Sequence, residues 1–134
     1  MQAPRFTGIA KTAALSKGLC VSGSERNGMI IESVGVIGSS HQHDELGRGL
    51  RSLLGPMRVE AGCVDCHLFQ DSTNPNAFRL EAYWRTEEDL TQHVRSEVYK
   101  KLLFLMEMGA EPPTIEFHEI SQTRGLDFIQ MVRQ

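Results

Sequence analysis

The chain has 134 residues, and its 17 aspartates and glutamates outnumber its 14 lysines and arginines to give a formal net charge of −3. This length suits a single domain, which can bury roughly two-thirds of its unfolded surface without a disulfide or a metal. A mildly acidic chain lacks the basic surface that attracts nucleic acids or anionic membranes, so we expect neither as a partner.

The start of the chain does not predict export or a membrane anchor. No apolar run approaches the roughly 20 residues that span a bilayer. The uninterrupted apolar run near the N-terminus is only Ala13-Ala14-Leu15, which is too short for the core of an export signal. The sequence therefore predicts a cytoplasmic protein whose cysteines stay reduced.

The first half of the chain predicts an arm, a strand and a helix. Residues 1–28 read as an appended arm, because 22–28 (SGSERNG) has the composition of a linker, and we expect this arm to pack against the domain. The β-branched run 29–38 (MIIESVGVIG) predicts a strand. Leucines at helical spacing predict a helix over 41–59, which Pro56 shortens or kinks.

The middle of the chain predicts a hairpin that leads into a helix. Residues 63–71 and 77–85 are rich in β-favouring side chains, and the run 72–76 (STNPN) between them is typical of a tight turn. Thr86 is placed to accept a hydrogen bond from the amide of Asp89 and so to cap the following helix.

The remaining elements complete a recognisable order. Ser96 begins a second helical segment, Pro112-Pro113 ends it, and the alternating residues 114–120 predict a final strand. Residues 125–133 form a short amphipathic tail. The order β-α-β-β-α-β is that of a ferredoxin-like α+β domain with a four-stranded antiparallel sheet.

We therefore divide the chain into an arm over 1–28, a domain over 29–121 and a C-terminal helical tail over 122–134. Four strands with both helices on one face leave the other face uncovered. An uncovered apolar face must find a partner, so we expect a homodimer formed through that face.

Several short motifs carry a family resemblance. They are Glu60-Ala61-Gly62-Cys63, Asn74-Pro75, Trp84, Glu87-Glu88-Asp89-Leu90, His93, Ser96 and Tyr99. Together they resemble the antibiotic biosynthesis monooxygenase-like family, which includes candidate quinol monooxygenases. The resemblance implies a ferredoxin-like protomer, a dimeric α/β barrel in which two sheets meet, and a pocket between sheet and helices in each subunit.

One polar group of that pocket is missing from the motif. Many members of the family carry a glutamate two residues before the tryptophan, where this chain has Ala82. Glu81 is one residue off and is expected to face the opposite side of the sheet.

Trp84 and His93 are the candidate catalytic residues. Trp84 closes a strand whose even positions form one apolar face, and its indole could stack on a planar substrate while its N–H donates to a substrate oxygen. A purely structural tryptophan is an equal alternative. His93 is a candidate general base, although pairing with Asp89 and Glu97 on its own helical face is the favoured interpretation. The candidate substrate-binding residues are Phe78, Leu80, Arg95 and Tyr99.

Two patterns suggest a metal or a haem, but neither is convincing. Cys63-Val64-Asp65-Cys66-His67 matches the motif for covalent c-type haem. In a regular strand, however, residues three apart face opposite sides, so two small side chains within a sheet are the preferred interpretation. A zinc knuckle would need a second pair of ligands. His41 and His43 are more often solvated than metal-bound, and His118 is expected at solvent or an interface. We expect no metal and no cofactor.

The resemblance, together with the apolar strand that Trp84 closes, thus implies a cofactor-independent monooxygenase that oxidises a quinol or polycyclic phenol with O2. No glycine-rich turn for a nucleotide is present, so the substrate itself would reduce O2 while the protein supplies a pocket, donors and a base. The alternative is a non-catalytic, dimeric small-ligand-binding or regulatory module of the same fold. The presence of Ala82 in place of the family's glutamate favours this alternative. Whether the protein is an enzyme stays open at this point.

Overall fold

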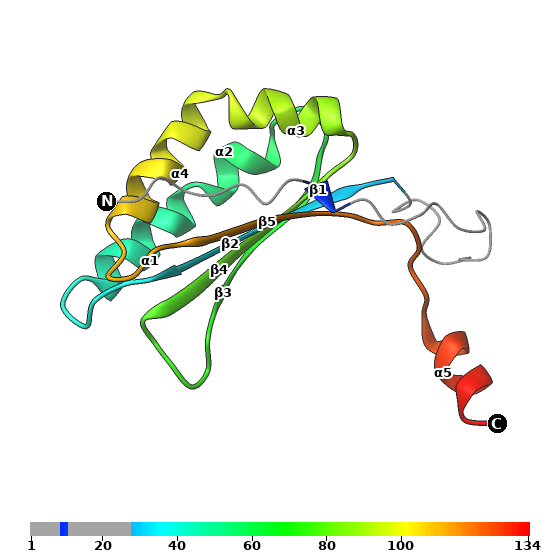
Figure 1. The fold of residues 1–134 in the computed structure, drawn as a ribbon. Coiled ribbons are helices and arrows are strands. Elements are labelled where there is room, and N and C mark those ends of the chain that lie inside the picture. The colour runs from blue at the N-terminus through cyan, green and yellow to red at the C-terminus, as the bar shows by residue number, and fades with distance from the viewer. Residues whose placement is uncertain (1–8, 11–27) are drawn as a thin grey trace.

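The computed structural model describes residues 9–10 and 28–134 of the chain, so most of the predicted arm lies outside the described residues. The domain has two layers, a twisted sheet and a layer of helices on one of its faces (Figure 1). The elements are β1 (Ile9–Ala10), β2 (Ile30–Ile37), α1 (His43–Ser52), α2 (Leu54–Arg58), β3 (Cys63–Gln70), β4 (Ala77–Trp84), α3 (Glu87–Val94), α4 (Glu97–Glu107), β5 (Thr114–Glu119) and α5 (Leu126–Val132).

The sheet has the strand order β1-β5-β2-β4-β3. The strands β5, β2, β4 and β3 are antiparallel, which confirms the predicted ferredoxin-like α+β domain. The two residues of β1 add a short parallel edge, with Ile9 opposite Phe117. This pairing ties one piece of the predicted arm to the sheet.

The predicted helix over 41–59 is two helices that meet at Leu53. Pro56 explains the interruption, because it has no N–H to donate to the carbonyl of Ser52 and its ring would press against that group. The caps of the later helices form as the sequence indicates. The Thr86 side chain accepts from the amide of Asp89 at 3.1 Å, and the Ser96 side chain accepts from the amide of Tyr99 at 3.2 Å.

The core lies between the sheet and the layer of α1–α4. Alternating residues of β2 and β4 point into it, as strand geometry requires, and meet the apolar stripes of α1 and α4. Its fully buried apolar side chains include Val34, Leu46, Leu50, Leu80, Ala82, Trp84, Leu102 and Met106.

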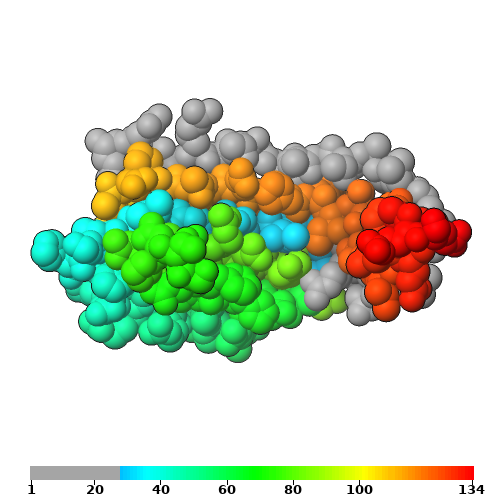
Figure 2. All heavy atoms as spheres, turned by 90° about the horizontal axis from the view of Figure 1, so that it is seen from below, coloured from blue at the N-terminus to red at the C-terminus, as the bar shows by residue number. Residues whose placement is uncertain are grey.

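The opposite face of the sheet, here called the open face, is less apolar than we expected. Phe69 is 49% exposed on β3, but its cross-strand neighbour is Arg79, which donates to the Ser33 hydroxyl at 2.6 Å. His67 and Glu81 form the next pair along. Figure 2 views the molecule from this side, with α5 at one end of the strands.

A bulge at the start of β3 corrects one argument from the sequence. The register shifts between Cys63 and Asp65, so that Cys63 lies opposite Trp84 and Cys66 lies opposite Ala82. Trp84 and Ala82 point to the same face of β4, and therefore both cysteines face the helices. The expectation that they face opposite sides was wrong, because it assumed a regular strand.

The turn before β3 requires glycine. The amide of Cys63 donates to the carbonyl of Glu60 at 3.1 Å, and Gly62 has φ 82°, a left-handed conformation that suits glycine. A Cβ at Gly62 would also overlap the carboxylate of Asp89 on α3. The motif at residues 60–63 is therefore a tight turn that packs closely against α3.

We predict that Gly62→Ala lowers the free energy of unfolding by about 1–3 kcal/mol in urea denaturation, through backbone strain and overlap with Asp89. Gly28→Ala is the matched control, because Gly28 also has positive φ but a Cβ there meets nothing within 4 Å. The Gly28→Ala variant should lose less free energy of unfolding than Gly62→Ala. Equal losses at both positions would show that the overlap contributes nothing.

Candidate functional site

Five polar or aromatic side chains meet inside the core, between the sheet and the helices α3 and α4. This buried cluster consists of Glu32, Glu60, Trp84, His93 and Tyr99. Glu32 and Trp84 are 0% exposed, and His93 and Tyr99 are each 1% exposed. A charged group in such surroundings is costly unless it is paired.

Glu32 supplies a carboxylate at the place where the family resemblance expected one. It lies on β2 directly opposite Ala82 of β4. The small side chain of Ala82 leaves room on the core-facing side of the sheet. The Trp84 indole N–H donates to Glu32 Oε1 at 3.0 Å.

The sequence analysis missed Glu32. Its position on β2 alternates with Ile30, Val34 and Val36, which are all buried. A single carboxylate among core-facing apolar residues was the signal that could have identified it, because glutamate is almost never fully buried unless it is paired.

His93 lies between two carboxylates. Its Nδ1 is 3.1 Å from both oxygens of Glu60. Its Nε2 is 3.1 Å from Glu32 Oε1, a charge contact that is not aligned as a hydrogen bond. The turn that begins at Glu60 and the helix α3 thus meet at this ring.

The predicted partners of His93 were wrong. Asp89 packs over Gly62 instead, and Glu97 is exposed and pairs with Lys100 at 3.3 Å. The sequence suggested them because they share a helical face with His93, but the ring turns inward from α3 toward the sheet.

The rings of the cluster are in direct contact. The imidazole of His93 stacks on the indole of Trp84 with centroids 4.3 Å apart and planes 25° apart. The edge of Tyr99 meets the same imidazole at 5.2 Å and 90°. A protonated imidazole in this stack gains a cation–π attraction.

The carboxylates favour the charged form of His93. Burial alone would lower the pKa of His93, but the nearby charge of Glu32, followed by the charge and hydrogen bonding of Glu60, outweighs burial and raises the pKa. An imidazolium carries a hydrogen on both ring nitrogens, and a carboxylate lies 3.1 Å from each of them.

The remaining titratable groups at the cluster stay neutral. Burial and then the charge of Glu32 raise the pKa of Tyr99, so its side chain is a hydroxyl rather than a phenolate. Burial and then the charges of Glu60 and Glu32 raise the pKa of the Cys63 thiol to about 11. Cys63 therefore borders the cluster as a weakly reactive thiol.

Three atoms of the buried cluster have unused hydrogen-bonding capacity. Glu32 Oε2, His93 Nε2 and the Tyr99 hydroxyl are buried without a hydrogen-bond partner. Each such atom costs about 1–3 kcal/mol in a protein interior. Buried polar atoms left this way often belong to functional sites rather than to packing.

The structure brings together three of the six predicted site residues, Trp84, His93 and Tyr99. Leu80 is a buried core residue on the same face of β4. Phe78 lies against Gly47 of α1, six residues and roughly 20 Å along the strand from Trp84. Arg95 is exposed at the C-cap of α3.

The pocket expected beside Trp84 is filled by side chains of the cluster. The indole N–H that was expected to reach a substrate donates to Glu32, and one ring face is covered by His93. Two hollows in the described surface lie elsewhere. One, of about 370 Å³, is lined by residues of α1 and α4 together with Leu53.

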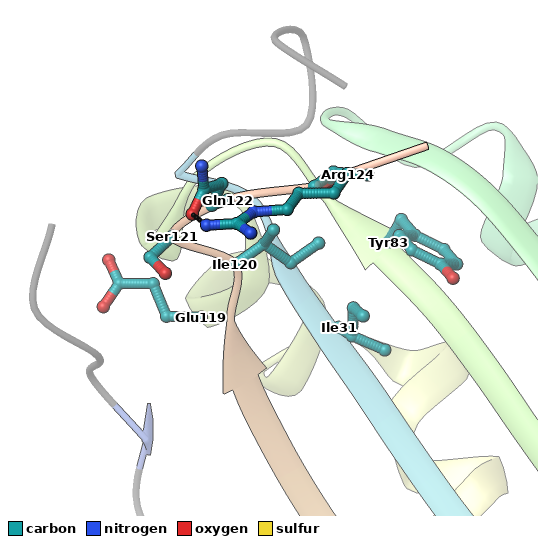
Figure 3. Close-up of a pocket in the computed structure, with 8 residues that line it drawn as sticks. Ile31, Tyr83, Glu119, Ile120, Ser121, Gln122 and Arg124 are labelled. Carbon is teal, nitrogen blue, oxygen red and sulfur yellow. Dashed lines mark hydrogen bonds between the residues drawn. The ribbon is translucent and has the colours of Figure 1, made fainter. Parts of the chain in front are cut away.

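The other hollow, of about 610 Å³, opens at the end of the open face (Figure 3). Ile31 and Tyr83 form its floor from neighbouring strands, and the guanidinium of Arg124 reaches over to Gln122 at 3.4 Å. No residue of the buried cluster lines it.

Neither metal pattern of the sequence forms a ligand cluster. Within residues 9–10 and 28–134, no group of three or more histidine, cysteine, aspartate or glutamate side chains could hold a metal ion. His41 is exposed, and His43 contacts the Ser40 carbonyl at 3.2 Å. Among the described helices, none has the length and apolarity of a membrane span.

The antiparallel sheet, its single layer of helices and the buried cluster define a ferredoxin-like α+β domain with a polar core site. Residues 38–103 match the model of the family described as antibiotic biosynthesis monooxygenase. Over this stretch, just under half of the chain, the domain is similar to the antibiotic biosynthesis monooxygenase-like family.

Solved structures share this fold. A conserved protein of unknown function from Bacteroides thetaiotaomicron, described as a possible oxidoreductase, is 22% identical with a TM-score of 0.64, covering 70% of this chain and 99% of its own. A conserved protein from Methanosarcina mazei is 23% identical with a TM-score of 0.64, covering 69% and 93%. A candidate antibiotic biosynthesis monooxygenase from Nitrosomonas europaea is 17% identical with a TM-score of 0.65, covering 74% and 96%.

One curated relative matches by sequence. An uncharacterized protein of Synechocystis is 25% identical over 77 residues, which cover 57% of this chain and 52% of that protein. The chain thus spans about half the length of the curated relative that it matches.

We predict that stability falls as the pH rises from 6 to 8. The folded pKa of His93 is raised above its ordinary 6.5, so its contribution is full below 6.5 and is lost as the pH rises through the folded value, by up to about 1.4 kcal/mol per pH unit. Urea denaturation at pH 6, 7 and 8 measures this loss, and His93→Gln should abolish it.

Glu60→Gln should narrow the pH range of this loss, because it removes one of the charges that raise the pKa of His93. Glu97→Gln, which changes an exposed carboxylate on α4, is the control. A profile that Glu60→Gln and Glu97→Gln alter equally would contradict the assignment of Glu60 to His93.

Proposed function

We propose that this domain is a cofactor-independent monooxygenase that oxidises a quinol or polycyclic phenol with O2 at the buried cluster. The match of residues 38–103 to the monooxygenase family model supports the class of reaction. The single observation that carries the proposal is the carboxylate oxygen Glu32 Oε2, which is buried without a hydrogen-bond partner beside the ring of His93.

The first step is removal of a proton from the substrate. A phenolic hydroxyl donates to Glu32 Oε2 and transfers its proton there, so that Glu32 acts as the general base. The imidazolium of His93 and the hydroxyl of Tyr99 stabilise the phenolate that forms. These groups act strongly because the cluster excludes water.

The second step is electron transfer from the substrate itself. The phenolate gives one electron to O2, and the resulting radical pair combines to form a carbon–oxygen bond. The peroxide takes back the proton from Glu32 and loses water. A hydroquinone and O2 thus become a hydroxyquinone and water, with no electrons drawn from the protein.

Trp84 is the positioning residue of this proposal. Its N–H orients the carboxylate of Glu32, and its ring supports His93. Leu80 belongs to the apolar wall of the same strand face. Phe78 and Arg95 have no role in the proposal, because one lies toward the far end of the strand and the other at the surface.

Substrate entry would follow the side of the cluster that is closest to solvent. The Glu60 side chain is 18% exposed, whereas those of Glu32 and His93 are 0% exposed. Movement of the turn Glu60–Cys63 away from α3 would open this side.

The alternative is a non-catalytic small-ligand-binding module. The closed state of the cluster favours it, because the indole N–H, one indole face and Glu32 Oε1 are already engaged within the protein. A module that binds a ligand without turnover needs only the groups that have no hydrogen-bond partner, Glu32 Oε2, His93 Nε2 and the Tyr99 hydroxyl.

We predict protein-dependent O2 uptake with a panel of hydroquinones that includes 1,4-dihydroxynaphthalene, measured by an oxygen electrode against a protein-free blank. Glu32→Gln should lower kcat/KM by roughly 100-fold, because the base is lost. Trp84→Phe should lower it by about 10-fold, through a misplaced carboxylate. His118→Gln, at an exposed position of β5, should leave the rate unchanged.

Absence of protein-dependent uptake across the panel, from a protein that still binds a phenol, would replace the enzyme by the binding module. Uptake that survives Glu32→Gln would refute the assigned base.

We propose further that the open face packs against a second copy of the chain. The helix α5 supports this proposal, because it lies on the open-face side of the sheet, beyond the ends of the strands (Figure 1). None of its residues is buried. It exposes Leu126, Phe128, Ile129, Met131 and Val132, and a helix this short needs packing to be stable.

We predict that light scattering after size exclusion gives twice the mass of one chain. Phe69→Asp, or removal of residues 125–134, should shift the protein toward monomer, because each removes apolar surface from the proposed interface. Val59→Asp, on the helix side and 84% exposed, should not. A wild-type monomer would overturn the proposed dimer.

A further inference from the structure

We propose that the buried cluster selects ligands that donate a hydrogen bond, so that it binds a quinol and rejects the corresponding quinone, with Glu32 as the selecting residue. The inference rests on the proposed function only in taking the cluster as the ligand site. It holds for an enzyme and for a binding module alike.

One carboxylate oxygen of Glu32 is left without a hydrogen-bond partner. Oε1 accepts from the Trp84 indole at 3.0 Å and faces His93 Nε2 at 3.1 Å. Oε2 is buried and has no partner. A carboxylate oxygen is an acceptor, so the ligand atom that meets it must carry a hydrogen. A quinone carbonyl or an ether oxygen would bring one acceptor against another.

The charges of the cluster exclude an anionic ligand as well. Two carboxylates, on Glu32 and Glu60, face one imidazolium. The other titratable groups beside these residues include Cys63 and Cys66 on β3 and Tyr99 on α4, and all three stay neutral because burial raises their pKa values. With two acidic side chains around one basic ring, the composition of the cluster favours a neutral donor over an anionic ligand.

Tyr99 adds affinity but little selectivity. Its hydroxyl is also buried without a partner, and a hydroxyl can either donate or accept. It can therefore serve a phenol, an ether or a carbonyl equally well. Selection between the reduced and the oxidised ligand falls to Glu32.

Donor selection has a consequence for turnover. A buried acceptor that loses its donor costs enough to weaken binding by roughly 10-fold to 100-fold. Oxidation converts a ligand hydroxyl into a carbonyl, so the product loses the contact that held the substrate. The hydroxyquinone product thus presents a carbonyl to Glu32 in place of the hydroxyl that donated there, and we expect the site to release it.

The experiment compares three neutral ligands of one shape: 1-naphthol, 1-methoxynaphthalene and naphthalene. Trp84 is the only tryptophan of the chain, so its indole N–H gives one side-chain signal in a proton–nitrogen NMR spectrum. Titrations without O2 follow that signal. We expect 1-naphthol to bind at least 10-fold more tightly than either ligand that lacks a donor.

Two variants identify the selecting group. Glu32→Gln keeps the shape but can present an amide donor, so the preference for 1-naphthol over 1-methoxynaphthalene should shrink to about threefold or less. Glu81→Gln is the matched control, because Glu81 lies on the neighbouring strand and faces the other side of the sheet. It should keep the wild-type preference.

The comparison of ligands in the wild-type protein stands even if Glu32→Gln fails to fold. Equal affinities for 1-naphthol and its methyl ether, or no shift of the indole signal with any ligand, would overturn the inference. So would an unchanged preference in a folded Glu32→Gln variant. Donor-selective binding without O2 uptake would instead refute only the monooxygenase.

Discussion

The contact between the buried carboxylate of Glu32 and the ring of His93 is the constraint around which this domain is built. When two groups of opposite charge are buried, the free energy lost by removing them from water can exceed the free energy gained from their attraction. Replacing such a pair by apolar residues therefore often stabilises a protein. A pair that stabilises so little needs another reason to be present. Its two partners, the Trp84 indole and the Glu60 carboxylate, hold it in one geometry, which is what a binding or catalytic site requires.

The parts of this arrangement that depend on nearby residues could be predicted, and those that depend on distant ones could not. The cap at Thr86 and the hairpin were visible because their interactions span a few positions. The pairing of Glu32 with Trp84 depends on the register between β2 and β4, which brings together residues 52 apart in the chain. The bulge after Cys63 likewise changes the face of the sheet on which a side chain lies, and no local sequence pattern predicted this bulge.

The same contrast separates the two faces of the sheet. The helix-facing side follows simple alternation, except where Glu32 interrupts it. The open face mixes Phe69 with the polar pair His67 and Glu81, so composition alone overestimated how apolar it is. The exposed apolar side chains of α5 add to the apolar surface on this side of the molecule.

The stack of His93 on the only indole of the chain has a spectroscopic consequence. An imidazolium in van der Waals contact with an excited indole accepts an electron from it and quenches its emission, whereas a neutral imidazole does so far less. The fluorescence of Trp84 therefore reports the protonation of His93. Its intrinsic fluorescence should brighten in alkali while the fold is still intact.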